Sequence, residues 1–182
     1  SKNGRRYLEK FKNDFWLDLK INDIPQTALS AIDSLKDLKR CKYITVHANG
    51  GFKMLKIIKK KTKLINKDLK VLGVTILTSL NNKSLKEIGY SKNVQRVVLE
   101  QAKLADKAKL DAIVCSPIEV KIVRKVFKKE IITPGIRFNS KANDQKRVQT
   151  PKQAYKNGSD WLVIGRPITK GNIQKNLKTL IK

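Results

Sequence analysis

The segment from Asp18 to Thr27 carries charged side chains where a buried strand would carry apolar ones. It directly follows Phe15-Trp16-Leu17, and Asp18 and Lys20 are two residues apart. Alternate side chains of a strand leave from the same face, so the two charges are expected to meet. Ionised groups in such strands are costly unless they are paired or take part in chemistry. Two interpretations follow: a structural ion pair at a strand end, or a carboxylate and an ammonium that act on a substrate.

Strands and helices alternate along the whole sequence. We predict strands at 15–20, 43–47, 71–77, 112–116, 131–137 and 161–164. We predict helices at 3–12, 27–39, 84–88, 94–109, 117–128, 151–156 and 173–181, and a basic helix that contains 54–63. This alternation predicts an α/β fold with parallel strands and right-handed crossovers, either as an open sheet or as a closed barrel. A length of 182 residues suits one domain, 1–182, with a full core.

Residues with chemical potential lie where the predicted strands end. In both architectures the chemistry collects at the carboxyl ends of the strands. The residues at these ends are Asp18, Lys20, Asp23, Thr78, Ser116, Arg137, Gly165 and Arg166. One charged strand end is compatible with a structural role, whereas several that converge on a single rim indicate a site.

The triplet Gly165-Arg166-Pro167 has the features of a phosphate site. Glycine allows close approach of the backbone, a helix start offers N–H groups, and arginine makes a two-pronged charged contact. An isolated triplet of this kind is equally compatible with a turn that carries a surface arginine. In the polar segment 138–149, which we predict to be a loop, Asp144-Gln145-Lys146-Arg147 is placed to close over the same phosphate.

The net charge of +26 first suggests a nucleic-acid-binding protein. The lysines, however, are spread over every predicted helix. The densest run, 56–63, alternates with Met54, Leu55 and Ile58 at helical spacing, which is typical of a solvated helix face around an apolar stripe. We therefore expect no nucleic-acid partner, and a positive field that favours a small anionic ligand such as a phosphate.

The remaining composition argues against membrane, secreted and metal-binding classes. No apolar run reaches the length of a membrane span, and the first residues lack the apolar block of a secretory signal. Cys41 and Cys115 lie in or beside apolar runs, so reduced thiols in a cytoplasmic protein are expected. His47 is the only histidine, so a zinc site is not expected, and we interpret His47 as a core residue.

Five ordered motifs resemble those of the orotidine 5′-phosphate decarboxylase family. They lie at 18–27, 73–79, 133–137, 144–147 and 163–169. The Asp-x-Lys-x-x-Asp pattern is shared with related sugar-phosphate enzymes, whereas Asp23-Ile24-Pro25 and the motif Thr-Pro-Gly-Ile-Arg at 133–137 point to the decarboxylase. Asn22 stands where a histidine is common in the family.

The resemblance implies a TIM-type (β/α)8 barrel that acts as a homodimer without metal or organic cofactor. It implies decarboxylation of orotidine 5′-monophosphate to uridine 5′-monophosphate in pyrimidine synthesis. Asp18 would face the substrate carboxylate, and Lys20 would protonate the carbon that loses carbon dioxide. Two carboxylates about 4 Å apart repel by roughly 4 kcal/mol at an effective dielectric near 20, and loss of carbon dioxide relieves this repulsion.

The resemblance also implies roles for the other matching residues. Those that would reach into the partner subunit's site are Asp23, Ile24 and Thr27. Those that would hold the phosphate are Arg137, Gln145, the Gly165 amide and Arg166. Those that would lie near the nucleoside are Thr78 and Ser116.

The family pattern has two further strands before the first helix predicted here. One carries an aspartate and the next a lysine, and neither has a counterpart in this sequence. We therefore expect about six of the eight βα units, and a fragment that is weakly active or inactive by itself.

Three alternatives to the decarboxylase remain. A sugar-phosphate decarboxylase or synthase of the same superfamily would need a magnesium ion, so a chelator would abolish its activity. A basic nucleic-acid-binding protein would show steeply salt-dependent binding to duplex. The third alternative is a non-catalytic remnant of the fold.

Overall fold

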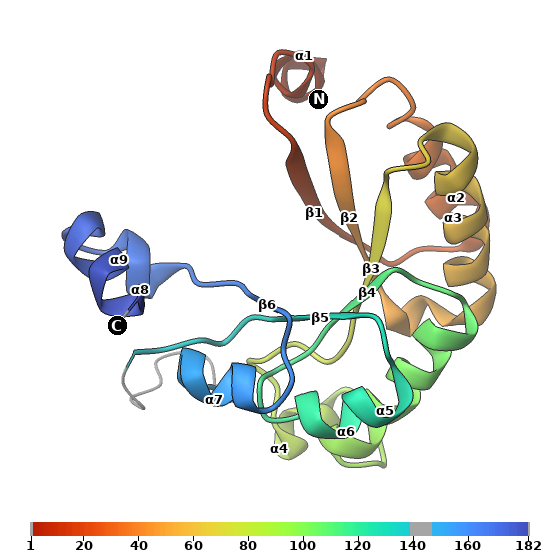
Figure 1. The fold of residues 1–182 in the computed structure, drawn as a ribbon. Coiled ribbons are helices and arrows are strands. Elements are labelled where there is room, and N and C mark those ends of the chain that lie inside the picture. The colour runs from red at the N-terminus through yellow and green to blue at the C-terminus, as the bar shows by residue number, and fades with distance from the viewer. Residues whose placement is uncertain (1, 139–146, 182) are drawn as a thin grey trace. The chain divides into compact units, whose positions relative to one another are not determined.

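A computed structural model describes residues 2–138 and 147–181 (Figure 1). Its strands are β1 (Phe15–Ile21), β2 (Cys41–His47), β3 (Lys70–Val74), β4 (Ala112–Val114), β5 (Glu130–Thr133) and β6 (Trp161–Leu162). Its helices are α1 (Lys2–Glu9), α2 (Pro25–Asp33), η1 (Ala48–Gly50, a 3₁₀ turn), α3 (Gly51–Ile65), α4 (Asn82–Glu87), α5 (Val94–Lys107), α6 (Val120–Val126), α7 (Pro151–Lys156), α8 (Arg166–Thr169) and α9 (Ile173–Ile181). The strands follow the order β1 to β6 in one sheet, which confirms an α/β fold with six parallel strands.

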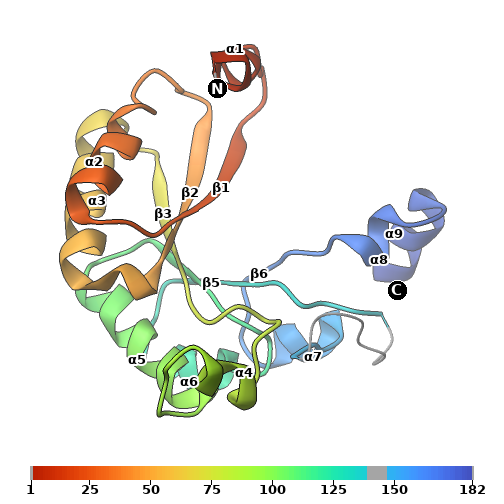
Figure 2. The same cartoon turned by 180° about the vertical axis from the view of Figure 1, so that it is seen from behind.

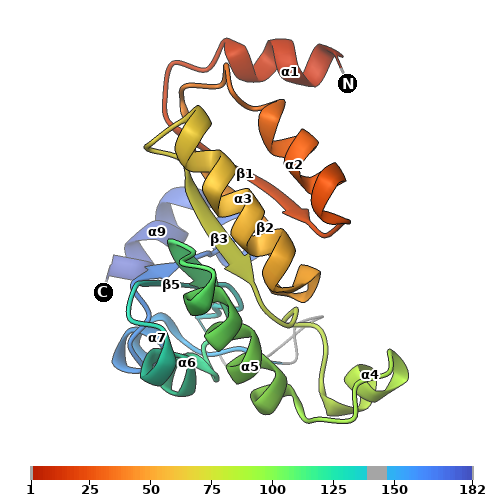
Figure 3. The same ribbon diagram turned by 90° about the vertical axis from the view of Figure 1, so that its right-hand side faces the viewer.

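The chain forms two compact units, Ser1–Val74 with Leu104–Ala112, and Thr75–Lys103 with Ile113–Lys182. In the first unit β1, β2 and β3 pair in parallel. Helices α2 and α3 cover one face of these strands, as the front, back and side views agree (Figures 1, 2 and 3). Ile32 of α2, Ile58 of α3 and Ile44 of β2 are fully buried, so the apolar stripes of both helices form this core.

Strand β1 is irregular where its charged residues lie. Leu17 pairs with Ile44 and Ile21 pairs with Val46, so four steps along β1 match two steps along β2. Lys20 has a φ of 50°, in the left-handed region that a lysine rarely adopts. Extra residues of this kind form a bulge, which turns side chains away from the directions of a regular strand.

In the second unit β5 and β6 pair in parallel. Phe127, which directly follows α6, has the largest fully buried side chain among the described residues. The helix α7 begins with a capping box, in which the Thr150 hydroxyl accepts from the Gln153 amide and the Gln153 side chain accepts from the Thr150 amide. The capping box stabilises the start of this helix, and the predicted helix 151–156 is confirmed. The predicted helix 173–181 is confirmed as α9.

Several predicted boundaries were wrong. The strands expected at 71–77 and 161–164 end at Val74 and Leu162, and the helix expected at 3–12 ends at Glu9. The helix expected from Pro117 begins at Val120, because Glu119 is its N-cap and 117–119 form a turn. The strand expected to run from 131 to 137 ends at Thr133, because Pro134 has no N–H to donate to a neighbouring strand. The helix expected at 27–39 covers Pro25–Asp33 and continues as turns.

The basic helix α3 differs in part from the solvated face predicted for it. Lys63 is exposed, as expected. Lys59 is only 7% exposed, and its ammonium donates to both carboxylate oxygens of Asp111. Asp111 Oδ2 also accepts from the Val71 amide, at 2.8 Å. One lysine of the run is therefore part of the core, and its charge is matched there.

Candidate active site

The predicted meeting of Asp18 and Lys20 is confirmed. Lys20 Nζ lies 2.5 Å from Asp18 Oδ2, and their side chains are 41% and 52% exposed, respectively. The pair lies at the bulge of β1, in place of the regular strand that the spacing predicted. The ion pair therefore faces solvent at the carboxyl end of β1, where a substrate has access to both groups.

Thr45 of β2 connects this pair to the sheet. It was not among the site residues predicted from the sequence. Its hydroxyl donates to Asp18 Oδ1 at 2.8 Å and accepts from the Lys20 amide at 2.9 Å. Thr45 is fully buried, whereas its two partners are not. The available sequence signal was a threonine between two apolar residues, Ile44 and Val46.

His47, at the end of β2, is half-buried and lies within the field of the same pair. Burial lowers the pKa of its imidazole, the Lys20 ammonium lowers it further, and the Asp18 carboxylate opposes both. His47 is thus a neighbour of the charged pair, and the core position expected for it is only partly reached.

The residues expected to serve a partner subunit are all exposed in this chain. Asp23, Ile24 and Thr27 lie at the start of α2, and Ile24 is 67% exposed. The Asp23 carboxylate accepts from the Ile24 amide at 2.7 Å. All three side chains are therefore accessible to another molecule.

In the second unit, Arg147 has a different position from the one predicted. We expected it in a segment that closes over a phosphate, but it is 7% exposed and paired with Glu119. Its Nη2 donates to the carbonyls of Ile76 and Leu77 at 2.9 and 2.8 Å. Its guanidinium is therefore committed to the protein itself. Gln145, Asp144 and Lys146 lie outside the described residues.

Thr78 and Ser116 follow β3 and β4, as predicted for residues near a nucleoside. Thr78 is half-buried. Ser116 is fully buried, and its hydroxyl donates to the Arg147 carbonyl at 3.2 Å and accepts from the Ile118 amide at 3.3 Å. Thr78 is thus the more accessible of the two.

The phosphate-binding candidates lie after β5 and β6. Arg137 Nη1 donates to the Ile136 carbonyl at 2.8 Å. Gly165 is exposed, and a Cβ atom placed on it would have no neighbour within 4 Å, so its backbone is open to a ligand. Gly165 is the N-cap of α8, whose first residue is Arg166. The helix start expected at this triplet is present, whereas the range 166–169 was not among the predicted helices.

Burial also sets the chemistry of several other groups. Burial raises the pKa of the Cys115 thiol, and it raises the pKa of Cys41 as well. Burial raises the pKa of Glu119, while the Arg147 guanidinium acts in the opposite direction. Within 2–138 and 147–181, no group of three or more histidine, cysteine, aspartate or glutamate residues is arranged to hold a metal ion. No helix in these ranges is long and apolar enough to cross a membrane.

Residues 2–178 match the family model described as "Orotidine 5'-phosphate decarboxylase / HUMPS family". The chain belongs to this family. The decarboxylase of Wolbachia pipientis subsp. Culex pipiens is 42% identical, over 93% of this chain and 74% of the relative. The decarboxylase of the Wolbachia of Brugia malayi is 43% identical, over 98% of this chain and 79% of the relative.

Solved structures of the decarboxylase family agree with the fold. The crystal structure of the Lactobacillus acidophilus orotidine 5′-phosphate decarboxylase aligns with a TM-score of 0.77 at 32% identity, over 93% of this chain and 76% of that one. The decarboxylase of Methanocaldococcus jannaschii, solved in complex with the inhibitor BMP, aligns with a TM-score of 0.74 at 21% identity. At that identity the second likeness supports the fold alone.

Proposed function

We propose that the protein catalyses the decarboxylation of orotidine 5′-monophosphate to uridine 5′-monophosphate, a carboxy-lyase step of pyrimidine synthesis. The main support for this proposal is the solvent-facing Asp18–Lys20 pair, in a chain that matches the decarboxylase family over residues 2–178. A match of this extent supports one family domain. The free, buried thiols of Cys41 and Cys115 support a reducing cytoplasmic location.

In the proposed mechanism both charged groups promote cleavage of the bond that releases carbon dioxide. Asp18 repels the substrate carboxylate, and departure of carbon dioxide removes the repulsion. A carbanion develops at the carbon that loses carbon dioxide. The Lys20 ammonium stabilises this carbanion and then donates a proton to it. The 2.5 Å contact between them keeps the ammonium beside the carboxylate before substrate arrives. Thr45 holds Asp18 and the Lys20 backbone in this arrangement.

The remaining substrate contacts are assigned by motif. We assign the phosphate to Arg137, Gln145, the Gly165 amide and Arg166, and the nucleoside to Thr78 and Ser116. Binding energy from the phosphate can hold the substrate carboxylate against the repulsion of Asp18. The open space around Gly165 supports its part of this assignment.

The function is tested on the natural protein that carries this chain. Loss of orotidine 5′-monophosphate absorbance is followed for the wild type, for Lys20→Ala and for Lys63→Ala, an exposed lysine of α3. We expect Lys20→Ala to lower kcat by at least about 100-fold, because a general acid is lost, and Lys63→Ala to leave it unchanged. Wild-type turnover that Lys20→Ala leaves intact would remove Lys20 from the mechanism. Turnover that a chelator abolishes would instead favour a metal-dependent member of the family.

We also propose that the enzyme is a homodimer in which Asp23, Ile24 and Thr27 complete the site of the partner subunit. The exposure of Ile24 supports this assignment. Mixing the Lys20→Ala and Asp23→Ala proteins tests it, since a mixed dimer contains one site with both residues intact. Random exchange should restore up to about a quarter of wild-type activity, from half the dimers and one of two sites. If Asp23 served its own subunit, mixing would restore nothing.

A further inference from the structure

One arginine side chain connects two separate places of the second unit. Arg147 Nη1 donates to Glu119 Oε1, at the N-cap of α6. Its Nη2 donates to the Ile76 and Leu77 carbonyls, which lie just beyond β3. Arg147 and Glu119 are 7% and 1% exposed, so these charged contacts are made in the interior. The guanidinium fork thus fixes the chain after β3 to the start of α6.

The backbone of Arg147 connects two more strand ends. Its carbonyl accepts from the Ser116 hydroxyl, which follows β4. Gly135, which follows β5, packs so closely that a Cβ atom on it would lie 3.0 Å from the same carbonyl. The chain on either side of Gly135 is held as well, because Gln149 N donates to the Gly135 carbonyl and Arg137 N donates to the Gln149 carbonyl.

These contacts lead to the residues assigned to the substrate. Thr78 is one residue beyond Leu77, Ser116 contacts Arg147 itself, and Arg137 is two residues beyond Gly135. A buried ion pair adds little net stability compared with an apolar pair, but removal of one partner leaves an unpaired buried charge. A pair of this kind is therefore well suited to hold strand ends in one arrangement, because any other arrangement costs more.

We propose that Glu119 and Arg147 are positioning residues, which hold Thr78, Ser116 and Arg137 in the geometry that binds substrate. The proposal rests on the function proposed above. Neither residue needs to touch the substrate. Their effect is on the placement of groups that do, and a misplacement of about 1 Å can cost about 100-fold in rate.

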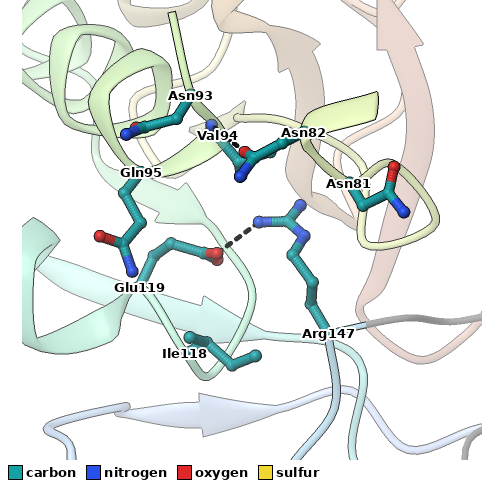
Figure 4. Close-up of a pocket in the computed structure, with 8 residues that line it drawn as sticks. All are labelled: Asn81, Asn82, Asn93, Val94, Gln95, Ile118, Glu119 and Arg147. Carbon is teal, nitrogen blue, oxygen red and sulfur yellow. Dashed lines mark hydrogen bonds and ion pairs between the residues drawn. The ribbon is translucent and has the colours of Figure 1, made fainter. Parts of the chain in front are cut away.

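A cavity of about 330 Å³ borders the pair (Figure 4). Its walls come from the N-terminal ends of α4 and α5, from the turn before α6 and from Arg147. The residues that line it are Asn81, Asn82, Asn93, Val94, Gln95, Ile118, Glu119 and Arg147. The space is large enough to admit a small planar cation to the position of a truncated arginine, which gives a direct test of the guanidinium's role.

The first measurement does not depend on turnover. Amide hydrogen exchange is compared in the wild type, Arg147→Met, Glu119→Gln and Lys59→Met. Lys59→Met also breaks a buried ion pair, but in the first unit, so it is a matched control. We expect faster exchange at 76–78 and 135–137 in the two test variants and not in the control. Unchanged exchange at these amides would overturn the proposal. Glu119→Gln keeps the shape of the side chain and serves if Arg147→Met does not fold.

The second measurement is kcat/KM, taken at a temperature where every variant is folded. We expect Arg147→Met and Glu119→Gln to lose about 10- to 100-fold, and Lys59→Met to stay within about twofold. Added methylguanidinium should restore part of the loss in Arg147→Ala and none in Lys20→Ala. Equal losses in the test variants and the control would overturn the proposal. An inactive wild type whose variants still show the exchange response would overturn the proposed function and leave the positioning role standing.

Discussion

The hydroxyl of Thr45 donates a hydrogen bond to Asp18 Oδ1 at 2.8 Å and accepts one from the Lys20 amide. A single buried side chain thereby fixes both members of the charged pair. We predict that Thr45→Val lowers kcat about 10-fold, since a hydrogen bond to a charged group contributes about 1.5–3 kcal/mol, and that Thr45→Ser retains activity. Steady-state turnover of orotidine 5′-monophosphate measures both.

Thr62→Val is the matched control for this prediction. Thr62 is also a fully buried threonine, and its hydroxyl donates to the Lys59 carbonyl within α3. We expect turnover in Thr62→Val to equal that of the wild type. Turnover that falls equally in both valine variants would show a general packing effect and contradict a positioning role for Thr45.

Gly135 has a φ of 79°, and a Cβ atom on it would lie 3.0 Å from the Arg147 carbonyl. We predict that Gly135→Ala destabilises the protein by more than the 1–2 kcal/mol that the left-handed backbone costs an alanine. Gly171 has a φ of 77° with no neighbour within 4 Å, so Gly171→Ala carries the backbone cost alone. Urea unfolding of both variants isolates the steric part, and equal losses would show that the contact with Arg147 is relaxed without cost.

Lys59→Met leaves the Asp111 carboxylate without its cation. Removal of one partner of a fully buried pair costs about 3–5 kcal/mol. The Asp111 side chain is 24% exposed, so we expect the lower part of that range. Lys61→Met is the control, because Lys61 lies on the same helix and pairs with Asp33 of α2, whose side chain is 48% exposed. If chemical unfolding showed that Lys61→Met loses as much stability as Lys59→Met, burial of the Lys59–Asp111 pair would not be the cause of the loss.

His47 should make stability depend on pH. Its pKa is lowered in the folded protein, so the unfolded chain binds a proton more readily. The corresponding stability is present above the unfolded value of about 6.5 and is lost as the pH falls through the folded value. We predict a smaller loss between pH 7.5 and 5.5 in His47→Gln, measured by thermal unfolding at both values. This chain has no other histidine to titrate in that window. An equal loss of stability in the wild type and in His47→Gln would therefore exclude His47 as its source.

Local pattern was sufficient for the alternation of strands and helices and for the meeting of Asp18 with Lys20. Periodicity and spacing act over a few residues, and both features depend on such distances. The boundary at Pro117 failed because the sequence suggested a proline at the first helical position, whereas the turn it begins delays the helix to Val120. The short helix at Arg166 has too few residues to produce a periodic pattern.

The side-chain contacts of the site that sequence reasoning missed join residues that are distant in the sequence. Thr45 is 27 residues from Asp18, and Glu119 is 28 residues from Arg147. Nothing in the local spacing indicates which carboxylate will meet which arginine. Arg147 was therefore placed with its sequence neighbours, near a phosphate, while its guanidinium is turned inward.

The left-handed backbone of Lys20 also affects whether its conformational energy lowers the stability of the fold or the rate of the reaction. Such a conformation costs a non-glycine residue about 1–3 kcal/mol, and here it is present before any substrate binds. The cost is met once, when the chain folds, and it lowers stability rather than rate. If the residue were relaxed and bent only during each catalytic cycle, the same energy would add to the activation barrier, where every 1.4 kcal/mol slows the reaction about tenfold. The folded protein is therefore less stable, and no turnover includes a step that bends the Lys20 backbone.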